Sequence, residues 1–581
     1  MLAAGKAAQA KLMLDLVLAD DPYNVPALEG LIQLASASGD AAASRRLLER
    51  LVSAAPGHID ARLALGDMLL QTGEAIAARA QAEQVLAISP GHPPAYYMLG
   101  ICCLQLGEIE AAYARFEDAR LDLAPQLFGY IQYMAHLSLA EADWRGYDAQ
   151  IAFFERRLAA GQASWQPTFS MLTSSSPADI GQAARSYAAM MHPAQTPLWQ
   201  GERWKNDRIR LGIVTGEIAD HPVAHLLVGV LENLDRSAFE VTGFDYGPVS
   251  DDPVRRRILA AFETFHEVAH LDDLAIARAV RRNDVDIAIW VGGYGHNSRP
   301  QILAHRPAPV QVNFQGYPGT MGAPWLDYLI ADKTVLPESE TPHYAEQIAW
   351  LPGAYQPTDN RAQIAPTPTR VQQGLPEGAF VFMAYNVAGK ISPAIFDVWM
   401  RIMKRTPGSV LWLPAGEGAA SANLRHEAQA RGIDPARLVF APRTPARAAH
   451  VARHRLADLF LDTLPFNAHS TASDALWAGL PVITCRGTTF PGRVCASLLT
   501  AAGLPELVTE TLADYEDLAV ALASDPMRLS ALRRRVTDEV HVSPLFDTAR
   551  YTRNLEAAFR EMYAISQAGE PPRSFAVEGS P

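Results

Sequence analysis

Hydroxyl groups and a histidine precede a helical segment near the end of the chain, in an arrangement suited to binding phosphate. The stretch Asn467-Ala-His-Ser-Thr471 comes directly before a helix that contains Asp474. The first N–H groups of a helix have no partner within the helix, so they can bind an anion together with nearby hydroxyls. We therefore predict that His469, Ser470 and Thr471 bind a diphosphate.

Two other motifs have compositions suited to a phosphate or sugar site. Residues 316–322, Gly-Tyr-Pro-Gly-Thr-Met-Gly, form a glycine-rich turn around Thr320, whose backbone N–H groups can approach ligand oxygens without obstruction by Cβ atoms. Arg447, His450 and Arg453 recur at three-residue steps, which places them on one face of a helix. Such a face is either a salt-bridged surface or part of a binding site.

Three further residues follow predicted strands. His221 and His225 lie in Asp-His-Pro-Val-Ala-His, just after the first apolar run, where a loop would face a cleft. Lys390 follows the strand that begins near Phe380. A histidine in such a loop can orient or deprotonate a hydroxyl, and a lysine can neutralise a phosphate.

The elements that carry these residues form two series of short apolar strands alternating with helices. The first series begins at Arg208 and the second near Phe380, and buried parallel strands have this pattern. Two doubly wound units follow, with a hinge at the Pro-rich stretch 365–369. A nucleotide would bind between them, at the carboxyl ends of the strands. No GxxxxGK[ST] loop is present and no GxGxxG follows the first strand, which disfavours kinases, ATPases and Rossmann dehydrogenases. No DxD pair stands on a loop after a strand where it would hold a metal-bound diphosphate, so we expect a mechanism without a metal.

The first 160 residues contain an internal repeat. Gly39, Gly73 and Gly107 are 34 residues apart, and four further columns of Pro, Ala and Gly keep the same phase. Each unit is predicted to be a helix, a turn at the glycine and a second helix, as in the tetratricopeptide repeat. The concave face of such a solenoid commonly binds extended peptides, although the helices could also serve only as a scaffold.

Composition narrows the class of protein. The chain has 581 residues, too many for one core, and a net charge of −13, which argues against a broad nucleic-acid surface. Four cysteines, without a disulfide framework or CxxC spacing, fit a reducing compartment, and no apolar run is long enough to span a membrane. We expect a cytoplasmic protein that binds neither membrane nor nucleic acid.

The motifs together resemble the O-GlcNAc transferase family, glycosyltransferase family 41, which includes SPINDLY-type relatives. The resemblance rests on residues 306–328, on His450-Val-Ala-Arg453, on 461–474 and on 476–482, and extends over about residues 205–565. It implies an N-terminal α-solenoid of tetratricopeptide repeats followed by a GT-B arrangement of two Rossmann-like α/β lobes. The predicted domains are an arm at 1–160, a connector at 161–204, an N-terminal lobe at 205–365, a C-terminal lobe at 366–568 and a disordered tail at 569–581.

The resemblance also implies roles for the candidate residues. His221 becomes an active-site histidine, and Lys390 becomes the lysine that neutralises the departing diphosphate. Thr320 and the glycine-rich turn border the sugar and the acceptor. The remaining predicted contacts to the nucleotide-sugar are His450 and Arg453 beside the base, Arg447 in place of a lysine that pairs with it, Asp474 on the ribose, and His469, Ser470 and Thr471 on the diphosphate, with Arg493 as a weaker candidate.

The function that the resemblance implies is inverting, metal-independent transfer of N-acetylglucosamine from UDP-GlcNAc to Ser or Thr hydroxyls of proteins, with no cofactor and with acceptors held by the repeats. Alternatives are GDP-fucose-dependent protein O-fucosylation, a degenerate transferase acting as a scaffold, and transfer to a glycan or small molecule. The motif around Lys390 departs from the eukaryotic-type pattern at Val387 and Gly389. The general base stays open among His221, an Asp–water chain and the donor's own α-phosphate, because this chain has Asp284-Val-Asp286 at a strand entry where some relatives carry a second histidine.

Overall fold

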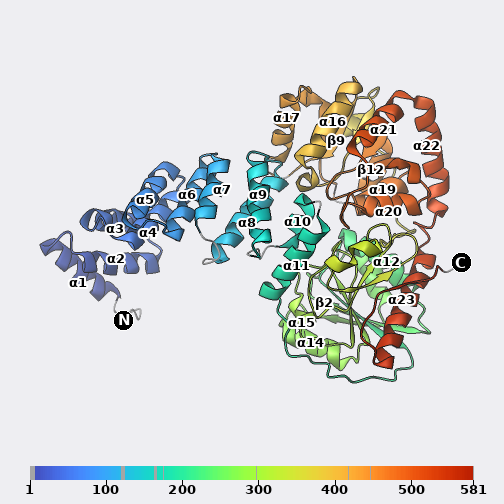
Figure 1. The fold of residues 1–581 in the computed structure, drawn as a ribbon, viewed down its shortest axis with the longest axis horizontal. Helices are drawn as coiled ribbons and strands as arrows, with labels where there is room; N and C mark the ends of the chain where they lie inside the picture. Colours follow the sequence, from blue (N-terminus) through green and yellow to red (C-terminus); the bar gives the residue numbers. More distant parts are fainter. Residues whose placement is uncertain are drawn as a thin grey trace. The chain divides into compact units, whose positions relative to one another are not determined.

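The computed structural model describes residues 7–119, 125–161, 166–174, 176–295, 297–416, 418–444 and 446–579. The chain divides into two compact units, one of residues 1–135 and 145–162 and the other of residues 136–144 and 163–581. Each unit is described on its own below, and Figure 1 gives the labels of the elements.

The first unit contains the predicted repeats as antiparallel helix pairs. Its helices, the eighth of which continues into the second unit, are α1 (Ala7–Asp20), α2 (Val25–Ser38), α3 (Ala41–Ala54), α4 (Ile59–Gln71), α5 (Ala75–Ile88), α6 (Pro93–Gln105), α7 (Ile109–Asp118), α8 (Pro125–Ala140) and α9 (Tyr147–Ala159).

The glycines that revealed the repeat end the first helix of each pair. Gly39, Gly73 and Gly107 have φ angles of 74°, 78° and 77°, a left-handed conformation that glycine adopts without steric cost. Gly66 and Gly100 lie where helices cross, since a Cβ at either would overlap Met98 or Phe116. The predicted tetratricopeptide repeat is therefore confirmed.

The predicted connector is part of the second unit rather than a separate linker. Helices α10 (Pro167–Thr173) and α11 (Pro177–Met191) place Met171, Ile180 and Ala188 in a core that also contains Val214 and Trp290 of the N-terminal lobe. Apolar residues of the connector thus gain burial by packing on the lobe.

The N-terminal lobe is built on a parallel sheet with the order β14-β7-β6-β5-β4-β1-β2-β3. Its strands are β1 (Ile209–Thr215), β2 (Phe239–Asp245), β3 (Thr264–Glu267), β4 (Ile287–Val291), β5 (Val310–Asn313), β6 (Tyr328–Ala331), β7 (Gln347–Trp350) and β14 (Phe575–Ala576), and its helices are α12 (Pro222–Asn233), α13 (Pro253–Ala261), α14 (Asp273–Arg282), α15 (Gln301–Ala304) and the 3₁₀ helix η2 (Glu338–His343). The order is that of a doubly wound sheet, in which β1 lies between β4 and β2.

The C-terminal lobe repeats this plan with the strand order β10-β9-β8-β11-β12-β13. Its strands are β8 (Val381–Met383), β9 (Val410–Pro414), β10 (Leu438–Ala441), β11 (Leu459–Leu461), β12 (Val482–Cys485) and β13 (Val508–Thr509). Its helices are α16 (Pro393–Arg405), α17 (Ala420–Ala430), α18 (Arg447–Arg453), α19 (Ser470–Trp477), α20 (Val494–Ala501), α21 (Leu512–Ser524) and α22 (Pro526–Glu539), with 3₁₀ turns η3 (Val371–Gln373), η4 (Ala388–Lys390), η5 (Pro435–Arg437), η6 (His454–Leu456), η7 (Pro505–Leu507) and η8 (Val540–Val542). The predicted fold class, a helical repeat followed by two α/β lobes, is confirmed.

Three predicted boundaries need correction. Helix α23 (Thr548–Ala568), expected in the C-terminal lobe, packs Leu555, Phe559 and Met562 into the core of the N-terminal lobe, and Figure 1 shows it in red beside α12. The tail is not disordered in its described part, through residue 579, because β14 pairs in parallel with β7. The hinge precedes the Pro-rich stretch, since Ala365 N already donates to Ala448 O of the C-terminal lobe at 3.1 Å.

Candidate functional site

Lys390 lies at the carboxyl end of β8, in the short turn η4. Its Nζ donates to Asn467 O at 3.0 Å and is 4.1 Å from the centre of the Phe466 ring. Burial lowers the pKa of Lys390 to about 8, and the nearby Asp462 carboxylate opposes the shift. A cation held in this way is oriented and partly stripped of water, which strengthens its interaction with an anion.

The loop that follows β11 positions both Asn467 and Phe466. Asp462 is 1% exposed, and its Oδ1 accepts from Thr463 N at 2.8 Å and Ala468 N at 2.6 Å. Its Oδ2 accepts from Thr484 Oγ1 at 2.6 Å. Burial raises the pKa of Asp462 to about 6, although these hydrogen bonds favour the carboxylate. Asp462 therefore fixes the loop between β11 and α19.

His469 follows this loop in the chain and also contacts Phe466. Its ring stacks on Phe466 with centroids 4.7 Å apart, and its Nε2 lies 3.1 Å from Pro491 O. Burial and then the charge of Lys390 hold the pKa of His469 well below its usual range. A neutral imidazole must carry its proton on Nε2 to donate to Pro491 O, which leaves Nδ1 as an acceptor.

Ser470 and Thr471 are half-buried at the first turn of α19, one and two residues after His469. Asp474, on the same helix, forms an ion pair with Arg447 of α18. The structure thus brings Lys390 and His469 together at Phe466, beyond the carboxyl ends of β8 and β11, and Ser470 and Thr471 follow His469 in the chain.

Helix α18 presents His450 above a buried arginine. Arg453 is 5% exposed, donates to Pro442 O at 2.7 Å, and lies 2.9 Å from Nδ1 of His450. Both His450 and Arg453 also contact Tyr385, with His450 at a centroid distance of 5.7 Å. Burial lowers the pKa of His450. Arg453 therefore orients His450, and His450 is the more accessible of the two.

In the N-terminal lobe, His221 is the N-cap of α12, directly after β1. Its Nδ1 is 2.7 Å from Oε2 of Glu217 and 3.4 Å from Val223 N. Nδ1 accepts the hydrogen bond from Val223 N, and the contact with Glu217 is an ion pair when the ring is protonated. The neutral ring accepts a proton on Nε2 only in the tautomer that turns Nδ1–H toward Glu217.

His225 is bound to a different carboxylate. Its Nε2 lies 2.7 Å from Oδ1 of Asp220, and burial lowers its pKa. Because the two histidines are four residues apart on α12, they share one face of the helix.

Thr320 does not have the environment expected of a donor-binding side chain. It is 1% exposed, and its hydroxyl donates to Glu346 Oε2 at 2.6 Å and accepts from Gly322 N at 2.9 Å. The hydroxyl is occupied within the turn, so the prediction that Thr320 binds the nucleotide-sugar is not supported by its side chain. Thr320 holds the glycine-rich turn in shape.

Comparison with known proteins identifies the family. The family model "Glycosyl transferase family 41" matches residues 186–367 and 356–555, and a tetratricopeptide-repeat model matches residues 1–67 and 69–126. The chain belongs to glycosyltransferase family 41.

Similar curated proteins come from a plant and an animal. The chain is 35% identical over 393 residues to the probable UDP-N-acetylglucosamine–peptide N-acetylglucosaminyltransferase SEC of Arabidopsis thaliana, covering 66% of this chain and 40% of that protein. It is 26% identical over 562 residues to the UDP-N-acetylglucosamine–peptide N-acetylglucosaminyltransferase of Caenorhabditis elegans, covering 74% and 48%. The chain thus spans less than half the length of these curated relatives.

A solved structure is similar over nearly the whole chain. The structure of a mutant O-GlcNAc transferase from Thermobaculum terrenum superposes with a TM-score of 0.63 at 28% identity, covering 94% of this chain and 98% of that chain. The similarity includes both the repeats and the two lobes.

Several residues that shape this family 41 site were not predicted as site residues. Glu217 lies four residues before His221, and Asp462 and Phe466 lie in the loop before His469. Their importance is seen only from their contacts in the structure. Asp462 ends an apolar strand, which is the one sequence signal that could have drawn attention to it.

Arg493 occupies a junction between the lobes. Its Nη2 is 3.3 Å from Oε1 of Glu340 in η2, and its Nε donates to Gly487 O at 3.1 Å. Within the described ranges no group of three or more His, Cys, Asp or Glu side chains could hold a metal ion, and no helix is long and apolar enough to cross a membrane.

Proposed function

We propose that this family 41 protein transfers N-acetylglucosamine from UDP-GlcNAc to Ser or Thr hydroxyls of proteins, with inversion at the anomeric carbon and without a metal or cofactor. The observation that carries the proposal is the grouping of Lys390 and His469 around Phe466 at the start of α19. The name of the Arabidopsis relative, a UDP-N-acetylglucosamine–peptide transferase, supports the choice of donor and acceptor.

In the proposed reaction, the acceptor oxygen attacks the anomeric carbon while the bond from that carbon to the β-phosphate oxygen breaks. UDP leaves with the bonding electrons, so negative charge develops on its β-phosphate. Lys390 and the free N–H groups of α19 stabilise that charge, aided by the hydroxyls of Ser470 and Thr471. No covalent enzyme intermediate is formed, and a single displacement inverts the configuration.

The nucleotide is proposed to lie along α18 and α19. His450, supported by Arg453, faces the base, and Asp474 binds the ribose hydroxyls. Because Asp474 is paired with Arg447, ribose binding shares or replaces that ion pair.

The proton of the acceptor hydroxyl is proposed to move to Nε2 of His221. In this proposal the neutral ring carries its proton on Nδ1, toward Glu217, so that Nε2 accepts the acceptor proton and Glu217 stabilises the imidazolium that forms. The donor's α-phosphate and a water bound to an aspartate are the competing acceptors of this proton.

The acceptors are proposed to be proteins held by the repeat unit, and the reaction is proposed to occur in the cytoplasm. A cavity of about 520 Å³ in the repeats is lined by charged and apolar residues, Lys11, Asp15, Leu34, Arg46 and Arg50 among them, which suits a peptide of mixed composition. The four cysteines are free and buried, as a reducing compartment allows.

Titration calorimetry with UDP and with GDP, without added metal, tests the donor. We expect UDP to bind more tightly than GDP and the Lys390→Ala variant to lose most of the UDP affinity. A preference for GDP would favour transfer of fucose. Binding of neither nucleotide would favour a scaffold without catalysis. A peptide assay with UDP-GlcNAc, followed by mass spectrometry, then tests transfer itself.

A further inference from the structure

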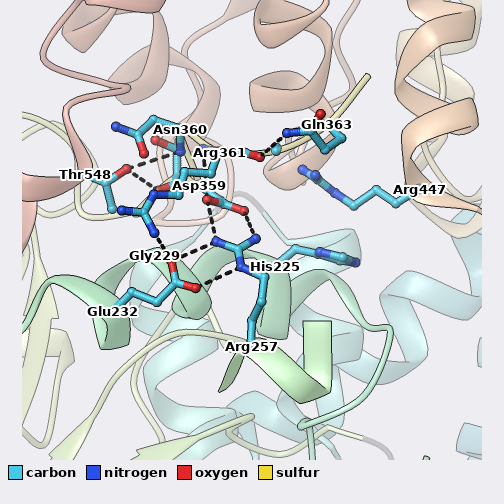
Figure 2. Close-up of polar contacts among 12 residues, drawn as sticks. His225, Gly229, Glu232, Arg257, Asp359, Asn360, Arg361, Gln363, Arg447 and Thr548 are labelled. Carbon is cyan, nitrogen blue, oxygen red and sulfur yellow. Dashed lines mark hydrogen bonds and ion pairs between the residues drawn. The ribbon is translucent and has the colours of Figure 1, made fainter. Parts of the chain in front are cut away.

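A cluster of four charged side chains joins the N-terminal lobe to the linker between the lobes. Arg257 on α13 donates to both carboxylate oxygens of Glu232 on α12 at 2.9 Å, and to those of Asp359 at 2.7 and 3.2 Å. Arg361 donates to Glu232 at 3.2 Å. Figure 2 shows the guanidinium of Arg257 between the two carboxylates. We call Arg257, Glu232 and Asp359 the linker clamp.

The clamp determines where the linker lies, because Asp359 is buried. Its side chain is only 2% exposed, whereas those of Arg257 and Glu232 are 33% and 18% exposed. A buried carboxylate is tolerated where its charge is compensated and its oxygens are hydrogen-bonded. Arg257 supplies both the charge and two donors, and the backbone N–H of Arg361 donates to Asp359 at 3.0 Å.

The linker is also fastened to the segment that returns from the C-terminal lobe. The Thr358 hydroxyl donates to Leu545 O at 2.7 Å, and the Thr548 hydroxyl donates to Thr358 O at 2.9 Å. Asn360 N donates to the same Thr548 oxygen at 3.3 Å. The two segments that connect the lobes, the linker and the segment that returns at Thr548, therefore meet next to the clamp, as seen in Figure 2.

Helix α12 connects the clamp to the candidate base. His221 is the N-cap of this helix, and Glu232 is eleven residues further on, about three turns away on the same face. Gly229 of α12 allows the linker to approach closely, since a Cβ there would lie 2.9 Å from Cγ2 of Thr548 and 3.6 Å from Cα of Asp359. A movement of the linker would therefore displace α12, which carries His221 at its N-terminus.

The other end of the same linker segment is bound to the helices predicted to hold the nucleotide. Trp477 Nε1 of α19 donates to Ala362 O at 3.1 Å, and Ala365 N donates to Ala448 O of α18 at 3.1 Å. The short stretch 359–365 thus runs from the clamp on one lobe to α18 and α19 on the other.

We propose that Arg257 is a positioning residue for glycosyl transfer: by holding Asp359 it sets the orientation of α18 and α19 relative to α12, and hence of the nucleotide relative to His221. The inference rests on the proposed function, because it takes the donor to bind between the lobes. Four of the five N–H groups of the Arg257 guanidinium donate to the two carboxylates of the clamp, which assigns the side chain to holding them.

Nucleotide binding and transfer kinetics in the full-length chain test the positioning role. The variants are Arg257→Gln, Asp359→Asn and Arg257→Lys, which keeps the charge but cannot make the four planar hydrogen bonds. The control is Arg256→Gln on the same helix, because the Arg256 side chain is 59% exposed and, among the described residues, forms an ion pair only with Asp251. We expect the first two variants to weaken UDP binding and donor kcat/KM about tenfold, Arg257→Lys to have an intermediate effect, and the control to match the parent.

The orientation of the lobes is measured separately from activity. Spin labels at Arg278→Cys on α14 and Gln429→Cys on α17 report the distance between the lobes, and all four native cysteines are buried. We expect a broader or shifted distance distribution in Arg257→Gln and Asp359→Asn than in the parent and in Arg256→Gln. Thermal unfolding shows which variants remain folded, and Arg257→Lys serves if Arg257→Gln does not fold.

The possible results separate the two proposals. An unchanged distance distribution, or unchanged UDP affinity, in folded clamp variants would overturn the positioning role. A reduced melting temperature with both of these unchanged would make the clamp merely structural and would also overturn it. A parent protein that binds no UDP would contradict the proposed function, whereas the distance distributions would still decide whether Arg257 orients the lobes.

Discussion

The two lobes prepare their parts of the candidate site in opposite ways. In the C-terminal lobe, Lys390 is fixed by Asn467 O and the Phe466 ring, and His469 stacks on the same ring. Asp462 holds the intervening loop by accepting two backbone N–H groups. Burial lowers the pKa of both Lys390 and His469.

The N-terminal lobe offers a more open group. The side chain of His221 is 47% exposed, and Glu217 is its partner at 2.7 Å, on Nδ1. This histidine is held at one ring nitrogen and left accessible at the other. In the glycine-rich turn, by contrast, Thr320 is buried and its hydroxyl is hydrogen-bonded to Glu346.

The difference matches the two tasks of a glycosyl transfer. A departing diphosphate is best stabilised by groups that are already oriented and poorly hydrated, because they need not reorganise as charge develops. A group that takes a proton from a protein hydroxyl must be reached by a large acceptor, so it has to stay exposed. We therefore expect mutations in the C-terminal lobe to act on the donor and those in the N-terminal lobe to act on the acceptor step.

The largest effect is expected from Lys390→Ala. Loss of the one ammonium beside Phe466 should lower kcat about a thousandfold, since it removes a preorganised charge from the leaving group. Steady-state transfer to a peptide measures the change. Lys404→Ala, an exposed lysine on α16, is the matched control and should have normal kcat. A loss below tenfold would mean that other groups neutralise the diphosphate.

Replacement of Asp462 by alanine should show how much this carboxylate stabilises the loop that positions Phe466 and Asn467. The change leaves the N–H groups of Thr463 and Ala468 buried without their acceptor, which we expect to cost about 3 kcal/mol of the free energy of unfolding. Denaturant unfolding measures it. Asp434→Ala removes an exposed aspartate that accepts from Ala436 N, and should cost under about 1 kcal/mol. Equal losses in the two variants would contradict a special role for the loop.

Much of the architecture could be predicted from periodicity. The 34-residue step of Gly39, Gly73 and Gly107 gave the repeat, because a left-handed helix end demands glycine at each turn. Apolar runs at Arg210 and Asp286 gave β1 and β4 within a residue or two, because strands buried on both faces are apolar throughout.

What could not be predicted depends on partners distant in sequence. The apolar face of α23 shows that Phe559 is buried, but not that it packs against the N-terminal lobe. The final residues are polar and Pro-rich, and only the open edge of β7 explains why Phe575 lies in a strand. Thr320 has the right type for a ligand contact, and only the position of Glu346 reveals that its hydroxyl is already bound.

The variants His221→Ala and Glu217→Gln test whether the N-terminal lobe acts on the acceptor step. His221→Ala should lower kcat about a hundredfold, and Glu217→Gln about tenfold, because glutamine keeps a carbonyl oxygen beside Nδ1 but not the negative charge. Neither should change UDP affinity by more than about twofold. His426→Ala, an exposed histidine on α17, is the control and should match the parent. Normal kcat in His221→Ala would assign the proton to the α-phosphate or to an aspartate-bound water.

The smallest expected effect is the pH dependence of UDP binding, which should depend on Lys390 of the C-terminal lobe and not on Glu217 of the N-terminal lobe. Because burial lowers the pKa of Lys390 to about 8, its ammonium is present below that pH and is lost as the pH rises through it. UDP should therefore bind about tenfold more weakly at pH 9 than at pH 7. Calorimetry across this range measures the change, and Lys390→Arg should abolish it because arginine stays charged. Glu217→Gln, in the other lobe, should leave the profile as it is in the parent. A parent profile that is flat from pH 7 to 9 would mean that the ammonium of Lys390 does not bind the diphosphate, and the contrast between the lobes would then rest on the kinetic variants alone.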